Sequence, residues 1–127
     1  MRRVDYVILY VRDLDASIRF YERLGLELKL RDRGYAEFVT DGTKFGLFEH
    51  GRARELLGRE PGGGGPGAEV LFLVEDVDAE TERLRAGGVE VLAGPRDRPW
   101  GHRTVHLLDP DGHVVELARE IERPGKP

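Results

Sequence analysis

The fold is decided by one stretch near the start of the chain, residues 4–28, with the sequence VDYVILYVRDLDASIRFYERLGLEL. Residues 4–11 are dense in valine, isoleucine, leucine and tyrosine, which is typical of a β-strand. Asp13 and Asp15 follow, and aspartates there can accept hydrogen bonds from the free N–H groups of a helix start. Gly25 supplies the left-handed residue that ends a helix. The stretch therefore predicts a strand and then a helix, whose apolar face carries Leu14, Ile18 and Tyr21.

The same pattern occurs a second time, 63 residues further along the chain. Seven residues are identical at this offset, beginning with Val7 and Val70. Farther on the offset becomes 70, where Asp41-Gly42 matches Asp111-Gly112. The second copy therefore has about seven extra residues, the difference between the two offsets, and we place them near residues 95–101.

Each copy continues with three short strands, which gives the order βαβββ. The predicted strands cover residues 27–30, 35–39 and 44–48 in the first copy and 89–92, 103–108 and 114–118 in the second. The predicted fold class is thus α+β, with two βαβββ modules in tandem. Module one covers residues 1–50, a Gly-rich linker 51–67, module two 68–120 and a C-terminal tail 121–127.

Length, charge and composition exclude several classes of protein. A chain of 127 residues fits one domain or two very small modules. The net charge of −4 disfavours sequence-independent binding of nucleic acid. The absence of cysteine excludes disulfides and thiolate zinc sites. We find no signal peptide and no apolar run of the roughly 20 residues that span a membrane, so we expect a cytoplasmic protein without a membrane partner.

Strand alternation separates a helix-facing side of each sheet from an open side. The Asp41-Gly42 turn places Glu37 across from Gly46 on the open side, and we expect the second hairpin to place Arg103 there beside Glu116. His102 and His106 would then face the helices. The open side combines aromatic and charged side chains, which is typical of a small-molecule pocket. With Trp100 from a loop, the candidate ligand-binding residues are Tyr6, Tyr10, Tyr35, Glu37, Phe48, Glu69, Trp100, Arg103 and Glu116.

Two stretches resemble the vicinal oxygen chelate superfamily, which includes glyoxalases, extradiol dioxygenases and bleomycin-resistance proteins. Residues 4–28 are similar to its opening, and residues 99–117, PWGHRTVHLLDPDGHVVEL, to its ending, most of all in the bleomycin-resistance branch. The resemblance implies that the paired modules form an open, curled mixed β-sheet barrel with the helices outside. It also implies a homodimer, because small members of this superfamily are commonly dimeric.

The resemblance further implies where a metal would bind. Enzymes of the superfamily hold a divalent metal with residues of the first and last strands of each module, usually two histidines and a glutamate. Those positions are Tyr6, Gly46, Glu69 and Glu116 in this chain. Because no histidine occupies them, we expect no metal cofactor, with Arg103 pairing with Glu116 instead. The alternative is an Mg²⁺ or Mn²⁺ site made of oxygen ligands: Glu69 and Glu116 with Tyr6 or Glu37.

The favoured function is therefore a metal-free protein that sequesters an aromatic or cationic small molecule, as antibiotic-resistance proteins of the bleomycin type do. Three carboxylates and several tyrosines on the open side favour such a ligand. The alternative is an enzyme: a metal-dependent lyase, isomerase or dioxygenase that uses the non-standard site of oxygen ligands, or an acid–base catalyst with Glu116 or Glu69 as the general base. A third possibility is a structural or regulatory dimer whose cavity is filled by its own side chains.

Overall fold

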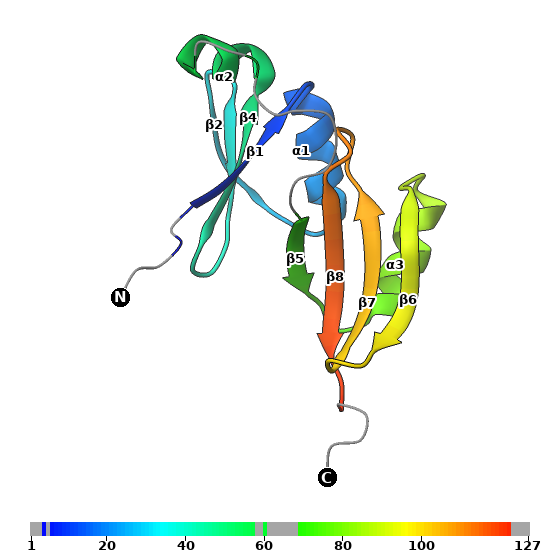
Figure 1. Ribbon diagram of the computed structural model, residues 1–127. Helices are drawn as coiled ribbons and strands as arrows, with labels where there is room; N and C mark the ends of the chain where they lie inside the picture. The colour runs from blue at the N-terminus through cyan, green and yellow to red at the C-terminus, as the bar shows by residue number, and fades with distance from the viewer. Residues whose placement is uncertain (1–3, 5, 58–59, 61–68, 123–127) are drawn as a thin grey trace. The chain divides into compact units, whose positions relative to one another are not determined.

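The structure is a computed structural model that describes residues 4, 6–57, 60 and 69–122. The chain divides into two compact units, residues 1–64 and 65–127. Each unit contains an open four-stranded mixed sheet and an α-helix packed against it (Figure 1). The predicted fold class, α+β with two βαβββ modules in tandem, is confirmed. Module one is the sheet of the first unit with its helices, and module two is that of the second.

Module one follows the predicted order of elements and ends in an additional helix. Its sheet has the order β1-β4-β3-β2, in which β1 pairs in parallel with β4 and the other pairs are antiparallel. The helix α2 lies in the segment that we assigned to the linker, and the glycines at 62–67 lie outside the described residues. The elements are β1 (Tyr6–Val11), α1 (Leu14–Arg23), β2 (Leu28–Asp32), β3 (Tyr35–Phe38), β4 (Lys44–Glu49) and α2 (His50–Leu57).

Module two repeats this topology, with the sheet order β5-β8-β7-β6. Its helix α3 covers one face of the sheet (Figure 1). The extra residues of this copy lengthen β6 and form the turn before β7, so β6 extends well beyond the predicted residue 92. The elements are β5 (Glu69–Leu73), α3 (Val77–Ala86), β6 (Val91–Arg98), β7 (His102–Leu108) and β8 (Val114–Glu120). In the described part of the chain, no helix has the length and apolar character needed to cross a bilayer.

Equivalent aspartates cap the two main helices, as the repeat predicts. The side chain of Asp13 accepts a hydrogen bond from the Ala16 N–H at 3.0 Å, and that of Asp76 does the same with the Ala79 N–H at 3.0 Å. Below these caps the apolar face of each helix is buried against its sheet. Tyr21 is fully buried and contacts the rings of Phe38 and Phe45. These contacts form the core on the helix-facing side of module one.

The hairpins of the two modules differ in length by an odd number of residues, which the sequence prediction missed. In module one Phe38 pairs with Phe45, so residues 39–44 form the connection. In module two Leu108 pairs with Val114, so the connection is residues 109–113. Because side chains alternate along a strand, this change exchanges the two faces of β7 relative to our prediction.

The five-residue connection is held by Asp109, which is 5% exposed. Its carboxylate oxygen Oδ1 accepts the backbone N–H of Asp111 at 2.9 Å and that of His113 at 2.8 Å. Its own N–H donates to the His113 carbonyl at 3.0 Å. The turn therefore satisfies its backbone groups internally, and it fixes the pairing of β7 with β8.

Candidate functional site

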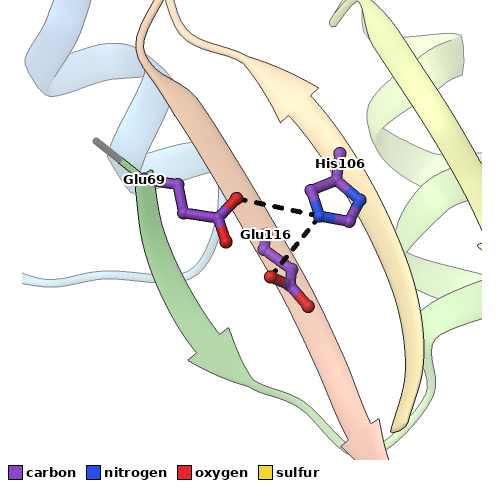
Figure 2. A group of neighbouring side chains, drawn as sticks. All are labelled: Glu69, His106 and Glu116. Atoms are coloured by element: carbon purple, nitrogen blue, oxygen red, sulfur yellow. Dashed lines mark ion pairs between the residues drawn. The ribbon is translucent and has the colours of Figure 1, made fainter. Parts of the chain in front are cut away.

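Three potential metal ligands converge on the open side of module two: Glu69, His106 and Glu116 (Figure 2). The Nε2 atom of His106 lies 3.4 Å from Oε1 of Glu116 and 3.7 Å from Oε2 of Glu69. One ligand atom from each residue lies within 4.8 Å of the other two. The chain therefore brings two carboxylates and one imidazole together at one point of the sheet.

The strand register explains why these residues meet. Glu116 on the central strand β8 pairs with His106 on β7, and across its other side with Leu71 on β5. Glu69 lies two residues before Leu71, so it shares the face of Leu71 and is a diagonal neighbour of Glu116. Each of three neighbouring strands thus contributes one member of the cluster.

The prediction that His106 faces the helices is therefore wrong. The register pairs His106 with Glu116, so both side chains lie on the open side of the sheet. It likewise pairs His102 with Glu120 on that side. Conversely Val105 and Leu107, which share the face of Arg103 on β7, are fully buried on the helix-facing side opposite Leu117 and Val115. The odd length of the turn is the reason. Testing both an even and an odd turn length would have shown His106 as a candidate ligand.

Burial and a neighbouring carboxylate perturb the pKa of Glu116. Its side chain is 7% exposed, whereas that of Glu69 is 48% exposed. Burial raises the pKa of Glu116, His106 opposes that rise, and the carboxylate of Glu69 adds to it. Two carboxylates this close repel one another when both are ionised, so the site favours a cation between them.

The residues present fit a divalent metal ion. The distances of 3.4 and 3.7 Å exceed the roughly 2.7–3.2 Å of a good hydrogen bond. An ion with bonds of about 2.1 Å holds neighbouring ligand atoms roughly 3.0–3.4 Å apart, which is close to this spacing. Imidazole and carboxylate together suit zinc, manganese or iron. The expectation of a metal-free site depended on the absence of histidine, and that premise is wrong because His106 belongs to the cluster.

The Nδ1 atom of His106 is buried and has no hydrogen-bond partner among the residues that the structure describes. Ligating histidines usually donate from their second nitrogen to a partner that fixes the ring, and loss of such a partner commonly weakens metal binding by roughly 10–100-fold. In the described part of the chain, the polar partners of the His106 ring are the carboxylates of Glu69 and Glu116, both of which lie on the Nε2 side. We therefore expect that a metal ion at this cluster would be held with moderate strength and that a chelator would readily remove it.

Arg103 does not pair with Glu116, so that prediction is also wrong. Its guanidinium donates to both carboxylate oxygens of Asp78 on α3, at 2.7 and 2.8 Å, and to Asp97 on β6 at 2.9 Å. The hydrogen bonds to these two carboxylates raise the pKa of Arg103, and the bond to Arg103 lowers the pKa of Asp78. Arg103 thus ties the start of α3 to the sheet on the helix-facing side.

Module one has a different group at the equivalent place. Gly46 pairs with Glu37 and Ile8, just as Glu116 pairs with His106 and Leu71. The ring of Tyr35 lies over Gly46, and its hydroxyl donates to Oε1 of Glu37 at 2.8 Å. Burial and the carboxylate of Glu37 raise the pKa of Tyr35. A phenol and a carboxylate therefore replace the chelating cluster in this module.

The remaining candidates take varied positions. Tyr6 lies on the open side of β1 and is 52% exposed, with the Lys44 ammonium 5.3 Å from its ring centroid. Phe48 lies beside Tyr35, with ring centroids 6.3 Å apart. Tyr10 pairs with Phe48 across β1 and β4 and is half-buried. Trp100 lies in the turn between β6 and β7, is 53% exposed, and has the Arg98 guanidinium 5.9 Å from its ring. Their roles in binding stay predictions.

Comparison with known proteins establishes the family. Residues 3–117 match the model of the Glyoxalase/Bleomycin resistance protein/Dioxygenase superfamily, and the chain belongs to that superfamily. A probable lactoylglutathione lyase of Vibrio parahaemolyticus is 30% identical over 91% of this chain and 88% of its own length. An uncharacterised protein of Mycolicibacterium smegmatis is 33% identical over 94% and 96%. A crystal structure of a glyoxalase/bleomycin resistance protein/dioxygenase from Nocardioides is 29% identical, has a TM-score of 0.80, and covers 100% of this chain and 90% of that one.

Proposed function

We propose that the protein is a metal-dependent member of the superfamily, in which Glu69, His106 and Glu116 hold one divalent ion. The observation that supports this most directly is the position of the His106 Nε2 atom, 3.4 and 3.7 Å from the two carboxylates. This assignment takes up the second of the sequence-based alternatives, the enzyme, and adds His106 to its ligands. Tyr6 and Glu37, the other oxygen ligands considered there, lie in module one.

A bound ion at this place would act as a Lewis acid that polarises an oxygen atom of a small-molecule ligand. The chain's own side chains give that ligand an apolar wall, because Leu71 and Leu73 share the open face of β5 with Glu69 and are 41% and 61% exposed. The arrangement suits a ligand that has an oxygen donor beside an apolar group. The similarity to a probable lactoylglutathione lyase favours lyase chemistry over the isomerase and dioxygenase alternatives.

A metal-free binding protein is the second candidate, and the same cluster supports it in another way. If His106 carries a proton, its charge compensates part of the negative charge of Glu69 and Glu116 without any ion. The open side would then bind an aromatic or cationic molecule, as the sequence predicts. Sequestration of an antibiotic belongs to this second candidate.

Metal analysis of the full chain separates the two candidates. We expect protein purified without chelators, then dialysed against Zn²⁺ or Mn²⁺ and freed of excess ion, to retain about one equivalent of metal. Glu116→Gln and His106→Gln should lose it, because each removes a ligand. His102→Gln is the matched control, since His102 lies on the same strand and face as His106 but outside the cluster, and it should retain the metal. Wild-type protein that retains no metal while remaining folded would favour the metal-free candidate.

The homodimer and the cytoplasmic location stay predictions. Static light scattering at micromolar concentration measures the oligomeric state directly, and a mass of about 14.3 kDa, that of one chain, would contradict the homodimer. Because the chain carries no cysteine, the same measurement needs no reducing agent.

A further inference from the structure

Module one contains a pocket of its own, with a volume of about 330 Å³. It is lined by residues of β2, β3 and β4 and of the turn between the last two. This volume is at the lower end of the range of about 300–1,000 Å³ that small-molecule sites occupy. Every residue that lines it belongs to the first unit, whereas Glu69, His106 and Glu116 belong to the second.

The charges around this pocket do not cancel. Glu37 forms part of its wall, is 5% exposed, and already has partners on both oxygens: the Tyr35 hydroxyl at 2.8 Å and the Lys29 ammonium at 3.5 Å. Lys44 also lines the pocket, and its ammonium lies above the ring of Tyr6. Among the described residues no carboxylate forms an ion pair with Lys44. One positive charge therefore remains for a ligand.

The use of lysine rather than arginine at this pocket also points to a ligand. The chain has 20 basic residues, of which 17 are arginines and three are lysines. Two of the three lysines line this pocket, and the third, Lys126, lies outside the described residues. An ammonium is a compact charge with three rotatable donors, whereas the guanidinium of arginine is a broad planar fork. Lysine thus suits a small anion.

We propose that this pocket binds a small organic carboxylate with an apolar body. Lys44, together with Lys29 on the opposite side of Glu37, attracts the carboxylate. The apolar body lies against Val39, which lines the pocket and is 48% exposed. The buried carboxylate of Glu37 is an acceptor for a hydroxyl group of the ligand, because an ionised carboxylate can accept more hydrogen bonds than the two it has. A hydroxylated aromatic acid meets all three conditions.

The test uses 4-hydroxybenzoate as the probe and 4-hydroxybenzamide, which has the same shape without the charge, as the matched ligand. Both are titrated into isotopically labelled full-length protein after treatment with a chelator, so that no metal can bind the carboxylate. We expect 4-hydroxybenzoate to shift the amide resonances of residues 37–44 and to bind at least about tenfold more tightly than the amide, as one charge-assisted hydrogen bond would give.

Three variants test the charges. Lys44→Gln should weaken binding of 4-hydroxybenzoate about tenfold. Glu37→Gln should strengthen it several-fold, since it removes a negative charge from the wall and releases Lys29, while the amide oxygen of glutamine can still accept the ligand hydroxyl. Arg19→Gln removes a positive charge from the exposed side of α1, against the opposite face of the sheet, and should leave binding unchanged.

Equal binding of the acid and the amide would overturn the proposal, as would a Lys44→Gln variant that binds like the wild type. Shifts confined to the neighbourhood of Glu69, His106 and Glu116 would also overturn it, because they would place the anion in module two. Since the protein is free of metal in this experiment, none of these results depends on whether module two is a metal centre.

Discussion

Substituting alanine for Gly46 tests whether the open side of module one depends on a missing side chain. A Cβ atom at Gly46 would lie 2.6 Å from the hydroxyl oxygen of Tyr35, 2.7 Å from its Cε1 and 2.9 Å from its Cζ. Real Cβ atoms do not approach other atoms so closely, so the ring must move. The displaced ring would lose its hydrogen bond to Glu37 and its edge contact with Phe48.

The cost follows from those two contacts. A hydrogen bond to a charged group contributes about 1.5–3 kcal/mol, and an aromatic pair about 0.5–1.5 kcal/mol. Tyr35 is half-exposed, so water replaces part of what is lost, and alanine stabilises a strand relative to glycine by about 0.5 kcal/mol. We therefore expect Gly46→Ala to lower the free energy of unfolding by about 1–2 kcal/mol.

A double-mutant cycle makes the prediction specific. In a Tyr35→Ala background the clash is absent, so Gly46→Ala should be neutral or slightly stabilising, with a coupling energy of about 2 kcal/mol between the two sites. Urea unfolding followed by circular dichroism measures all four proteins. Gly87→Ala is a suitable control, because a Cβ atom there would approach no atom closer than 3.5 Å. An equal cost of Gly46→Ala in both backgrounds would refute the reasoning.

Three further predictions concern charges and the turn. The pKa of Asp78 is lower in the folded protein than in the unfolded chain, so its pairing with Arg103 stabilises the fold above about pH 5 and stops doing so as the pH falls through the folded-state pKa. Urea midpoints of Arg103→Gln should therefore lie below those of the wild type at neutral pH and approach them once the pH is below that folded-state pKa. The pKa of Tyr35 is raised, so the stability that its neutral phenol contributes is present below about pH 10 and disappears as the pH rises through the folded-state pKa. In an ultraviolet titration, Tyr35→Phe should remove one tyrosine that ionises late, and in Glu37→Gln that tyrosine should ionise earlier. Asp109→Ala leaves two backbone N–H groups of the turn without their acceptor and should cost about 1–3 kcal/mol in urea unfolding, and a value near zero would show that the turn is held by other contacts.

Most of the fold could be predicted because both copies carry strong local signals. The caps at Asp13 and Asp76 and the buried helix face with Tyr21 depend on near neighbours in the chain, and the structure confirms each of them. The repeat then fixed the order of elements in module two from module one. The extent of β6 could not be predicted in this way, because its residues have no counterpart in the first copy.

The candidate site was predicted less well, because it depends on pairing between strands. Glu69 and Glu116 were recognised from their places on their own strands, which needs no knowledge of turn length. The prediction placed His106 and Arg103 on the wrong faces of β7, because their orientation depends on whether the turn at 109–113 has an odd or an even number of residues. The partners of Arg103 and the pocket at Lys29 and Lys44 arise from tertiary packing, for which the sequence carried no local signal.

The odd turn of module two has a consequence for the divergence of duplicated modules. Deleting or inserting a single residue in such a turn would exchange in one step every side chain that β7 presents to the open side, without any substitution in the strand. Histidine and arginine would trade places, and a chelating surface would become a basic one. Among related proteins, a gap of one residue at this turn is thus a better guide to altered chemistry than the identity of the strand residues on either side of it.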